Sequence, residues 1–322
     1  KYYKYLEMKN FITLDDLPNF EECINQAIQL KKNPYSFEDI GKRKTIGMLF
    51  FNPSLRTRLS TQVAAQNLGF KTMIMNFSNE AWALEFENGT QMGGLRSEHI
   101  KEAAAVVSQY CDMIAIRAFA SLNDKIQDES EIVLNSFSKY ANIPIINMES
   151  ATRHPLQAIA DAITIRENIT TFRPKVVLTW TPHPKALPHA VGNSFTKMMN
   201  FIDAEYVITQ PKGYELDKRI TKNASIVYDQ EKALEGADFV YAKNWSSYEQ
   251  YGKILRTDDK WMLTGKKMKK TNNAKFMHCL PIRRNIVVSD DVLDTPNSLV
   301  IKQANNRTCA TQSVLKILLD NE

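Results

Sequence analysis

The sequence of 322 residues lacks several features that would assign it to a functional class at once. No apolar stretch approaches the length of a membrane span and no signal peptide is visible, which favours a cytoplasmic protein. No Walker A motif, Gly-x-x-x-x-Gly-Lys, is present, so a nucleotide-binding loop of that type is excluded. The few cysteines are scattered without a Cys-x-x-Cys pair. We therefore expect reduced thiols and no cysteine-rich structural metal site at Cys23, Cys111, Cys279 and Cys309.

A strong excess of one charge is also absent. The chain has 41 basic and 36 acidic residues, and its lysines cluster only locally, as in 266–270. Because no basic face interleaved with aromatic residues accompanies them, nucleic-acid binding is disfavoured, and a binding module for phosphorylated or nucleic-acid ligands is only the non-enzymatic alternative. The 43% hydrophobic and 24% charged content is typical of a globular protein, and the length allows two domains. Residues 1–7, before Met8, resemble the remnant of a tag.

Short apolar runs alternate with helical patterns along the whole chain. The predicted strands are 45–51, 72–76, 113–116, 144–148, 175–180, 205–208, 237–241, 275–278 and 298–301. The predicted helices are 59–68, 97–110, 129–140, 188–200, 214–220 and 311–320. This alternation predicts an α/β protein with two doubly wound parallel-sheet domains and sites at the carboxyl ends of the strands. We expect the domains to cover 8–150 and 151–307, with a last helix, 308–322, packing on the first domain.

The segment Phe51-Asn-Pro-Ser-Leu-Arg-Thr-Arg58 indicates an anion site. A buried strand runs into an Asn-Pro break, and a helix with Ser54 as its N-cap follows. Backbone N–H groups, hydroxyls and a guanidinium at a helix N-terminus suit a phosphate dianion. We expect Arg56 to meet the anion and Arg58 to hold the loop, because the two point to nearly opposite sides of a helix. A capped surface helix with solvated arginines is the alternative.

Two further motifs contain histidine. His154 and Gln157 are three residues apart at the start of a helix, so both could hydrogen-bond a small carbonyl and its amide, with helix capping as the alternative. His278 and Cys279 suggest a Cys–His nucleophile pair, but neighbours on a strand face opposite ways. The backbone carbonyls of Cys279 and Leu280 at the strand end are therefore the better candidates. A hydrolase that uses Cys279 is the rival enzyme.

Arginines at two other places are candidates for the same anion. Arg117 ends the strand 113–116 and could supply a second cation to a phosphate. Arg307, in the segment 304–307, is similar. A structural salt bridge is the alternative role for each.

Three motifs in this order resemble the aspartate/ornithine carbamoyltransferase family: Phe-x-Pro-Ser-x-Arg-Thr-Arg at 51–58, His-Pro-x-Gln at 154–157 and His-Cys-Leu-Pro at 278–281. The resemblance spans 8–322 and implies a carbamoyl-phosphate domain, an amino-acid domain, an active site between them, and a homotrimer with shared active sites. It implies no metal and no organic cofactor. By this likeness the donor is bound by Ser54, Leu55, Arg56, Thr57, Arg117, His154, Gln157, Cys279, Leu280 and Arg307, of which Arg56, Arg117 and His154 are catalytic.

The acceptor region departs from the ornithine enzymes. The segment 242–252 lacks their Asp-x-x-x-Ser-Met-Gly loop and has Lys243, which is wrong for an ammonium group but suits an acylated, anionic substrate. The chain instead resembles the N-acylornithine branch of the family. That likeness implies that Trp82 reaches a neighbouring subunit's carbamoyl phosphate, and that the acylornithine contacts Glu149, His183, Lys243 and Arg283.

The acyl group depends on Ser97, just before Glu-His-Ile100. By the resemblance, acetyl-type enzymes have glutamate there and succinyl-type enzymes have proline. A glutamate would repel and crowd a succinyl carboxylate, so its absence favours N-succinylornithine as the acceptor, with N-acetylornithine as the alternative. The expected reaction produces N-succinylcitrulline and phosphate and belongs to arginine biosynthesis.

Overall fold

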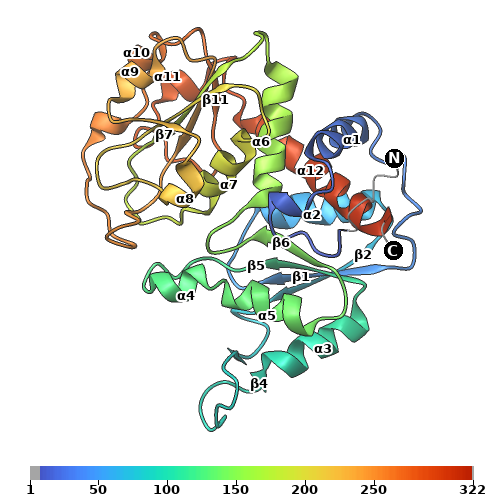
Figure 1. Ribbon diagram of the computed structural model, residues 1–322. Helices are drawn as coiled ribbons and strands as arrows, with labels where there is room; N and C mark the ends of the chain where they lie inside the picture. The colour runs from blue at the N-terminus through green and yellow to red at the C-terminus, as the bar shows by residue number, and fades with distance from the viewer. Residues whose placement is uncertain (1–7, 321–322) are drawn as a thin grey trace. The chain divides into compact units, whose positions relative to one another are not determined.

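The computed structural model describes residues 8–320, so the expected tag remnant at 1–7 lies outside the described residues. The chain divides into two compact units, shown in Figure 1. Within the described part, unit 1 comprises 8–121, 126–156 and 307–320, and unit 2 comprises 122–125 and 157–306. Compared with the expected boundary at 150, unit 1 runs six residues further and takes the C-terminal segment from 307.

Unit 1 contains a parallel four-stranded sheet in the order β2-β1-β5-β6. Its strands are β1 (Thr45–Phe50), β2 (Lys71–Asn76), β5 (Met113–Arg117) and β6 (Ile145–Glu149). The chain leaves β1 towards β2 on one side and returns to β5 on the other. The carboxyl ends of β1 and β5 therefore form a topological switch point, where open parallel sheets bind ligands.

Helices cover this sheet and complete its core. The helical elements of unit 1 are η1 (Leu14–Asp16), α1 (Phe20–Lys32), α2 (Arg56–Asn67), α3 (Ile100–Tyr110), most of α4 (Lys125–Glu129), α5 (Ile132–Tyr140) and the larger part of α12 (Val300–Asp320). One core cluster joins Leu49 of β1 and Ile114 of β5 to Ile100 of α3 and Phe137 of α5. Each such buried side chain contributes about 1.5–3 kcal/mol to the free energy of unfolding.

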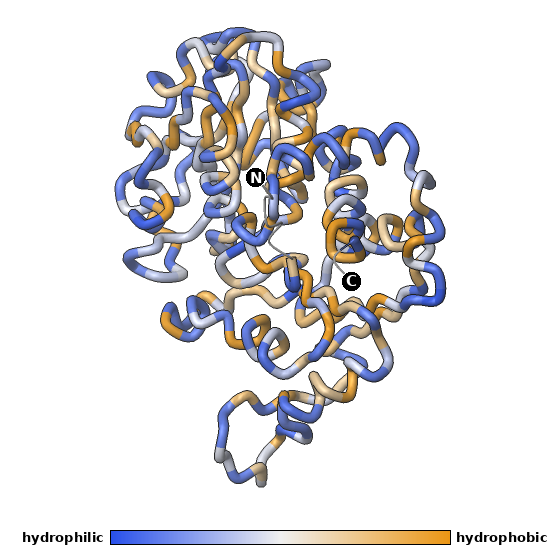
Figure 2. The backbone as a smooth tube through the Cα atoms, turned by 45° about the vertical axis from the view of Figure 1, so that its right-hand side comes forward, coloured by the Kyte–Doolittle hydropathy of each residue, from blue (hydrophilic) through white to orange (hydrophobic). Residues whose placement is uncertain are grey.

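A small two-stranded parallel sheet, β3 (Leu84–Glu85) with β4 (Glu98–His99), lies beside α3. The loop between them projects from the rest of unit 1 (Figures 1 and 2). Glu85 fastens its base, because the carboxylate accepts from the backbone of Phe86 and Glu87 and from Arg96. These hydrogen bonds, led by that from Glu87, lower the pKa of Glu85.

Unit 2 contains a parallel five-stranded sheet in the order β11-β10-β7-β8-β9. Its strands are β7 (Lys175–Trp180), β8 (Glu205–Thr209), β9 (Ser225–Val227), β10 (Phe239–Lys243) and β11 (Lys275–Met277). The helical elements of this unit are most of α6 (Pro155–Asn168), α7 (Ala190–Met199), α8 (Lys218–Thr221), α9 (Gln230–Leu234), η2 (Asp259–Trp261), α10 (Gly265–Met268), α11 (Asp290–Leu293) and the start of α12. The second switch point lies between β7 and β10.

The predicted α/β class with two parallel sheets is confirmed. Eight of the nine predicted strands exist, with ends that differ by a few residues. The strand predicted at 298–301 is wrong, because only an isolated bridge joins Ser298 to Phe276 before α12 begins at Val300. A short apolar run does not by itself distinguish a strand from a turn of a buried helix. Here Val300 is buried and Ile301 is exposed in the first turn of α12. The edge strand β9 was not predicted.

Several helix boundaries also differ from the prediction. The helix expected at 97–110 begins at Ile100, because Glu98 and His99 pair in β4 and the His99 side chain caps α3 by accepting from the Lys101 backbone N–H. The helix expected at 214–220 is reduced to α8. Tyr214 lies in a buried loop and accepts two backbone N–H groups through its hydroxyl. The C-terminal helix begins eleven residues before the predicted 311.

Candidate active site

Unit 1 gathers polar side chains at the carboxyl ends of β1, β5 and β6. Thr57, in the first turn of α2, is 1% exposed, and its hydroxyl accepts from two guanidinium groups. Arg117 Nη1 lies 3.3 Å and Arg307 Nη2 lies 2.6 Å from Thr57 Oγ1. Both arginines are buried. Residues far apart in the sequence thus present two cations to the start of α2.

A buried carboxylate joins this group. Glu149, at the end of β6, is ion-paired with Arg117, and its Oε2 lies 3.2 Å from His154 Nε2. The salt bridge that was the alternative role for Arg117 is therefore present. The cation of Arg117 also lies 4.1 Å from the centre of the Phe119 ring. Arg117 Nε is buried and has no hydrogen-bond partner among the described residues.

The start of α2 differs from the prediction in one respect, because Leu55 rather than Ser54 is the N-cap. Ser54 Oγ accepts from the Thr57 backbone N–H at 3.3 Å, although the helix itself begins at Arg56. Leu55 is exposed, so its contribution to a ligand site would be made by the backbone. The Arg58 guanidinium lies 5.7 Å from the centre of the Phe50 ring, so it packs on the end of β1.

Unit 2 gathers cations at the carboxyl ends of its central strands. His183 follows β7, and its Nε2 accepts from Arg283 Nε at 3.2 Å. Its Nδ1 lies 2.9 Å from the Lys185 carbonyl oxygen and 3.0 Å from the Lys185 backbone nitrogen, and because Nε2 accepts from Arg283, a neutral ring would carry its proton on Nδ1. Burial lowers the pKa of His183 below its ordinary value of 6.5. The charges of Arg283, Lys243 and Lys185 act in the same direction, against the hydrogen bond to Lys185.

Of the two neighbouring arginines after β11, one has a structural role and the other is a candidate functional residue. Arg284 is neutralised by Asp290 and Asp294 at 2.7 Å each. Arg283 forms no salt bridge with a described residue, and neither do Lys243 and Lys185. Three cations without carboxylate partners therefore surround one neutral imidazole. Lys185 was missed in the sequence analysis, although its position two residues after His183 is a signal for it.

A buried hydrogen-bond network supports the turn after β11. Asp161, fully buried in α6, accepts from both Gln157 and Gln303 at 2.7 Å. Gln303 in turn accepts from the His278 backbone N–H at 2.9 Å. Burial, followed by the Asp161 charge, raises the pKa of Tyr241 well above its ordinary value. Gln157 thus lies in unit 2, whereas its predicted companion His154 lies in unit 1.

The Cys279–Leu280 turn has an unusual backbone. Leu280 has a φ of +57°, which is rare for a residue with a side chain and is typically associated with functional turns. The Leu280 backbone N–H donates to His278 Nδ1 at 2.8 Å. That ring nitrogen therefore already accepts a hydrogen bond from the backbone, which leaves it unsuited as a base for the Cys279 thiol.

The remaining candidate residues, Trp82 and Ser97, lie at the base of the projecting loop. Trp82 is 57% exposed, and its indole N–H donates to Glu98 at 2.7 Å. Ser97 is exposed beside Glu98, and its backbone N–H donates to the Ala83 carbonyl. Trp82 precedes β3 and Ser97 precedes β4, so the two residues lie at the paired base of the loop.

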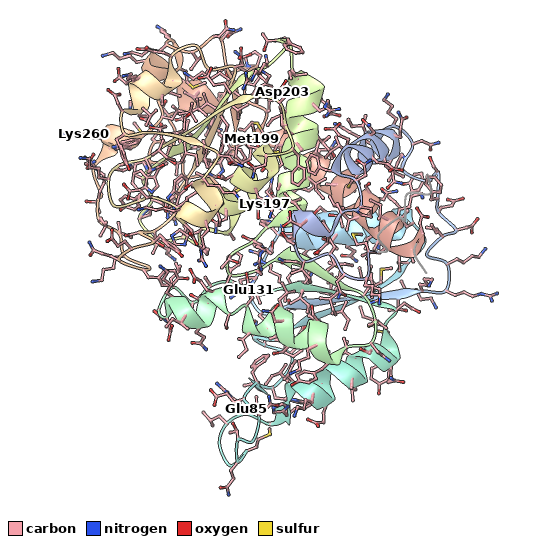
Figure 3. All side chains as sticks on the ribbon, in the orientation of Figure 1. Glu85, Glu131, Lys197, Met199, Asp203 and Lys260 are labelled. Carbon is pink, nitrogen blue, oxygen red and sulfur yellow. The ribbon has the colours of Figure 1, made fainter. Side chains whose placement is uncertain are left out.

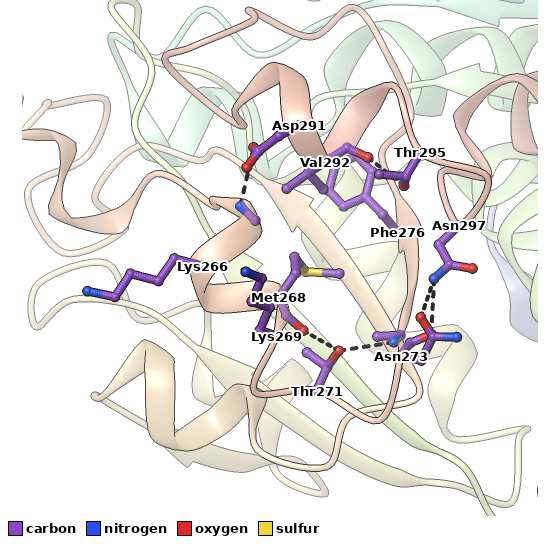
Figure 4. A pocket seen from close by; sticks show the side chains of 12 residues that line it. Lys266, Met268, Lys269, Thr271, Asn273, Phe276, Asp291, Val292, Thr295 and Asn297 are labelled. Atoms are coloured by element: carbon purple, nitrogen blue, oxygen red, sulfur yellow. Dashed lines mark hydrogen bonds between the residues drawn. The ribbon is translucent and has the colours of Figure 1, made fainter.

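Figure 4 shows a cavity of about 710 Å³ in unit 2 that contains none of the predicted site residues. Its polar groups bond to one another, as Asn297 does with Asn273 and Thr271 with the Met268 carbonyl. Within 8–320, no group of three or more His, Cys, Asp or Glu side chains could hold a metal ion. No helix in the same range is long and apolar enough to cross a membrane.

Two protein-family models match the chain. The carbamoyl-phosphate-binding domain of aspartate/ornithine carbamoyltransferases matches residues 9–167, and the aspartate/ornithine-binding domain matches 189–318. The first range contains Thr57, Arg117, Glu149 and His154 of unit 1, whereas Arg307 falls in the second range, most of which lies in unit 2.

Relatives agree over nearly the whole chain. The N-succinylornithine carbamoyltransferase of Bacteroides fragilis is 49% identical, covering 98% of this chain and 99% of its own. The N-acetylornithine carbamoyltransferase of Xanthomonas campestris pv. campestris is 36% identical, covering 98% of each. A glutamate-to-serine variant of N-acetyl-L-ornithine transcarbamylase, solved with carbamyl phosphate and N-succinyl-L-norvaline, has a TM-score of 0.89 and 36% identity, covering 95% of this chain and 98% of its own. The motif-based resemblance is confirmed: the chain belongs to the aspartate/ornithine carbamoyltransferase family of transferases.

Proposed function

We propose that the protein transfers the carbamoyl group of carbamoyl phosphate to the δ-amine of N-succinyl-L-ornithine, producing N-succinyl-L-citrulline and phosphate. The observation that carries this choice of acceptor is the set of three unpaired cations around His183 in unit 2. An acylornithine has no α-ammonium group, so its net charge suits a cationic site, whereas free ornithine would be repelled.

Unit 1 is the proposed donor domain. The phosphate would be bound by Arg56, Arg117 and Arg307 together with Ser54, the Leu55 backbone and Thr57. Glu149 is the carboxylate that pairs with one of these three arginines, Arg117. A buried site with more positive than negative charge favours a phosphate dianion. Because hydrogen bonds and an ion pair fix Thr57, Arg117 and Arg307 to one another and to Glu149, little reorganisation is needed at the moment of reaction.

In the proposed chemical step the neutral δ-amine attacks the carbonyl carbon of carbamoyl phosphate. The new C–N bond forms, the C–O bond to phosphate breaks, and phosphate leaves with the electron pair and takes the amine proton. His154 and Arg307 polarise the carbonyl oxygen, and Gln157 with the backbone carbonyls of Cys279 and Leu280 holds the carbamoyl amide. The Leu280 backbone conformation supports this role because it orients a carbonyl that a regular strand would not.

Unit 2 is the proposed acceptor domain. Arg283 and Lys243 would bind the two carboxylates of N-succinylornithine, and His183 would donate or accept a hydrogen bond beside them. Glu149, which the family resemblance also places at the acceptor, lies in unit 1, where it is paired with Arg117 and His154. We assign it a position next to the attacking amine rather than next to the carboxylates.

The acyl group is assigned from Ser97. The family resemblance places a glutamate of the acetyl-type enzymes at this position, and we take it to be the glutamate that is replaced by serine in the complex with N-succinyl-L-norvaline. The 49% identity to a succinylornithine enzyme, against 36% to an acetylornithine enzyme, supports the same choice. N-acetylornithine is the second candidate.

We further propose a cytoplasmic homotrimer that acts in arginine biosynthesis. In this assembly Trp82 and Ser97 would reach the active site of a neighbouring subunit, which gives a purpose to a projecting loop with an exposed indole. Light scattering on the purified chain should give the mass of three copies. Deleting 88–95 should abolish turnover, because it removes the part of the loop that projects.

One experiment tests the proposed function. Carbamoyl phosphate is mixed separately with ornithine, N-acetylornithine and N-succinylornithine, and both ureido product and phosphate are measured. N-succinylornithine should have the highest kcat/KM and ornithine no measurable product. Salt-sensitive nucleic-acid binding without phosphate release would instead favour a binding module. A Cys279→Ser variant separates the hydrolase rival, because it should retain turnover if only the backbone of residue 279 is used.

A further inference from the structure

Glu131 is a buried acidic residue that the reaction described above does not use. It precedes α5 and is 5% exposed, and Figure 3 labels it at the start of that helix. Its φ of +50° is a left-handed conformation that a glycine or asparagine adopts with less strain. The presence of glutamate at such a position requires an explanation from its side chain.

The carboxylate binds the whole connection between Glu149 and His154. Ser150 Oγ, the Thr152 backbone N–H and Thr152 Oγ1 donate to Glu131 Oε1 at 2.8, 2.8 and 2.5 Å. The Ala151 backbone N–H donates to Glu131 Oε2 at 3.1 Å.

Arg153 completes the set with a guanidinium 3.8 Å from Glu131 Oε1. All four residues between Glu149 and His154 therefore contact this single side chain. The position of the carboxylate at the amino end of α5 also favours its negative charge.

This connection fixes two groups of the proposed site. Glu149 ends β6 and contacts Arg117, and His154 begins the next segment with its Nε2 3.2 Å from Glu149 Oε2. Within the loop itself the Ser150 backbone N–H donates to the Arg153 carbonyl at 2.8 Å, and the Glu131 carboxylate adds contacts to all four residues, so without it the loop, and His154 with it, would be less fixed. We propose that Glu131 is a positioning residue for carbamoyl transfer, which holds His154 and Glu149 in register with Arg117 by binding the loop between them. This inference rests on the proposed function.

The test compares Glu131→Gln with the wild type. Glutamine keeps the size of the side chain but places an amide N–H₂ opposite N–H donors, so the loop must move. A displacement of about 1 Å in a catalytic group costs up to about 100-fold in rate. We expect kcat to fall about 10- to 100-fold and the affinity for inorganic phosphate, measured by calorimetry, to fall about tenfold. The KM for N-succinylornithine should change less than kcat, because Arg283 and Lys243, which would bind its two carboxylates, lie in unit 2.

Asp112→Asn is the matched control. Asp112 Oδ2 also accepts a backbone N–H in unit 1, that of Thr45 at 2.6 Å, but at the amino end of the sheet. This variant should lower Tm while kcat stays within twofold of the wild type. An equal loss of kcat in both variants at equal loss of Tm would overturn the inference, as would a Glu131→Gln enzyme with wild-type kcat.

Thr152→Val provides a second, milder variant if Glu131→Gln does not fold. It removes one hydroxyl donor and leaves the carboxylate in place, so kcat should fall a few-fold with a smaller change in the acceptor KM. An unchanged kcat would overturn the inference. Failure of the wild type itself to form ureido product would refute the proposed function, whereas the phosphate affinities of variant and wild type would still decide whether Glu131 positions the anion site.

Discussion

The polar groups at the sheet ends of the two units differ in their exposure and in whether their charges are paired with other protein groups. In unit 1, Thr57, Arg117, Glu149, His154 and Arg307 are all at most 8% exposed and are bonded to one another. In unit 2, Lys185 and Arg283 are exposed, Lys243 and His183 are half-buried, and none of the three cations has a carboxylate partner in the described residues.

This difference corresponds to two tasks. A transition-state site benefits from groups that are fixed in advance, because reorganisation would add to the barrier. In a specificity site the charged side chains can remain solvated until an anionic ligand pairs with them, and solvated, unpaired charges lower the stability of the fold only slightly. We therefore expect changes in unit 1 to lower kcat and changes in unit 2 to raise the acceptor KM.

The largest effect should come from His154→Ala. It removes a buried side chain that we propose to donate to the reacting carbonyl, and the loss of one such donor lowers kcat by about 10²- to 10³-fold. Steady-state kinetics with both substrates varied would measure it. His189→Gln is the control, because His189 is equally buried but bonds to the Ser246 carbonyl, which a glutamine amide can still reach. If the two variants lost similar activity, the distinction between fixed catalytic and structural histidines would fail.

A smaller effect of a different kind should follow from Arg283→Gln. One charge-assisted contact contributes about 1.5–3 kcal/mol, so the KM for N-succinylornithine should rise about 10- to 100-fold while kcat changes less. Arg284→Gln is the matched control. It breaks an exposed ion-pair network with Asp290 and Asp294, which contributes about 1 kcal/mol or less to stability, and should leave KM unchanged. A fall in kcat without a change in KM for Arg283→Gln would refute the assigned division of tasks.

The same contrast shows what could be predicted from the sequence. Strand periodicity and the break after Phe51 were enough to place Thr57 and Arg117 at carboxyl ends of parallel strands in one domain, whereas the expected boundary at 150 assigned His154 to the other domain. The convergence of Arg307 on Thr57 was expected only from the family resemblance, because α12 folds back over a separation of 250 residues.

The features that were not predicted depend on contacts between residues far apart in the chain, which a local sequence pattern does not reveal. Glu131 precedes an ordinary amphipathic helix, and nothing in its neighbourhood indicates that its carboxylate contacts residues 150–153. The choice between Arg283 and Arg284 is similar, since the aspartates that neutralise Arg284 lie six and ten residues further on. Long-range pairing, rather than residue type, separates structural from functional charges here.

Ser97→Glu should have a modest effect that tests the acyl group. Two like charges about 4 Å apart in water repel by about 1 kcal/mol, so the ratio of kcat/KM for succinylornithine to that for acetylornithine should fall about fivefold. Ser97→Gln adds the same bulk without the charge and separates repulsion from crowding. An unchanged ratio in both variants would mean that the loop of unit 1 does not contribute to acyl selection.

The smallest effect should be seen in Lys185→Gln, as a shift in the titration of His183. The Lys185 cation disfavours the imidazolium, so its removal should raise the pKa of His183 towards 6.5, measured from the Cε1–H resonance by NMR. Lys222→Gln, an exposed lysine elsewhere in unit 2, should leave this resonance unchanged. If Lys185→Gln left it unchanged too, Lys185 would not belong to the cation group.

This shift has a consequence for stability with a defined sign. Because the folded pKa of His183 lies below its ordinary value, the unfolded chain binds the proton more readily, and stability is lost as the pH falls from 6.5 to the folded pKa. Protonation also removes the acceptor at Nε2 that receives the Arg283 N–H. Raising the folded pKa by Lys185→Gln should therefore narrow the pH window in which Tm falls, and should move the acid-side rise of the acceptor KM to higher pH. The pKa of His183 and the acceptor KM should thus depend on a single exposed lysine, whereas the buried group of unit 1 should not respond to this change.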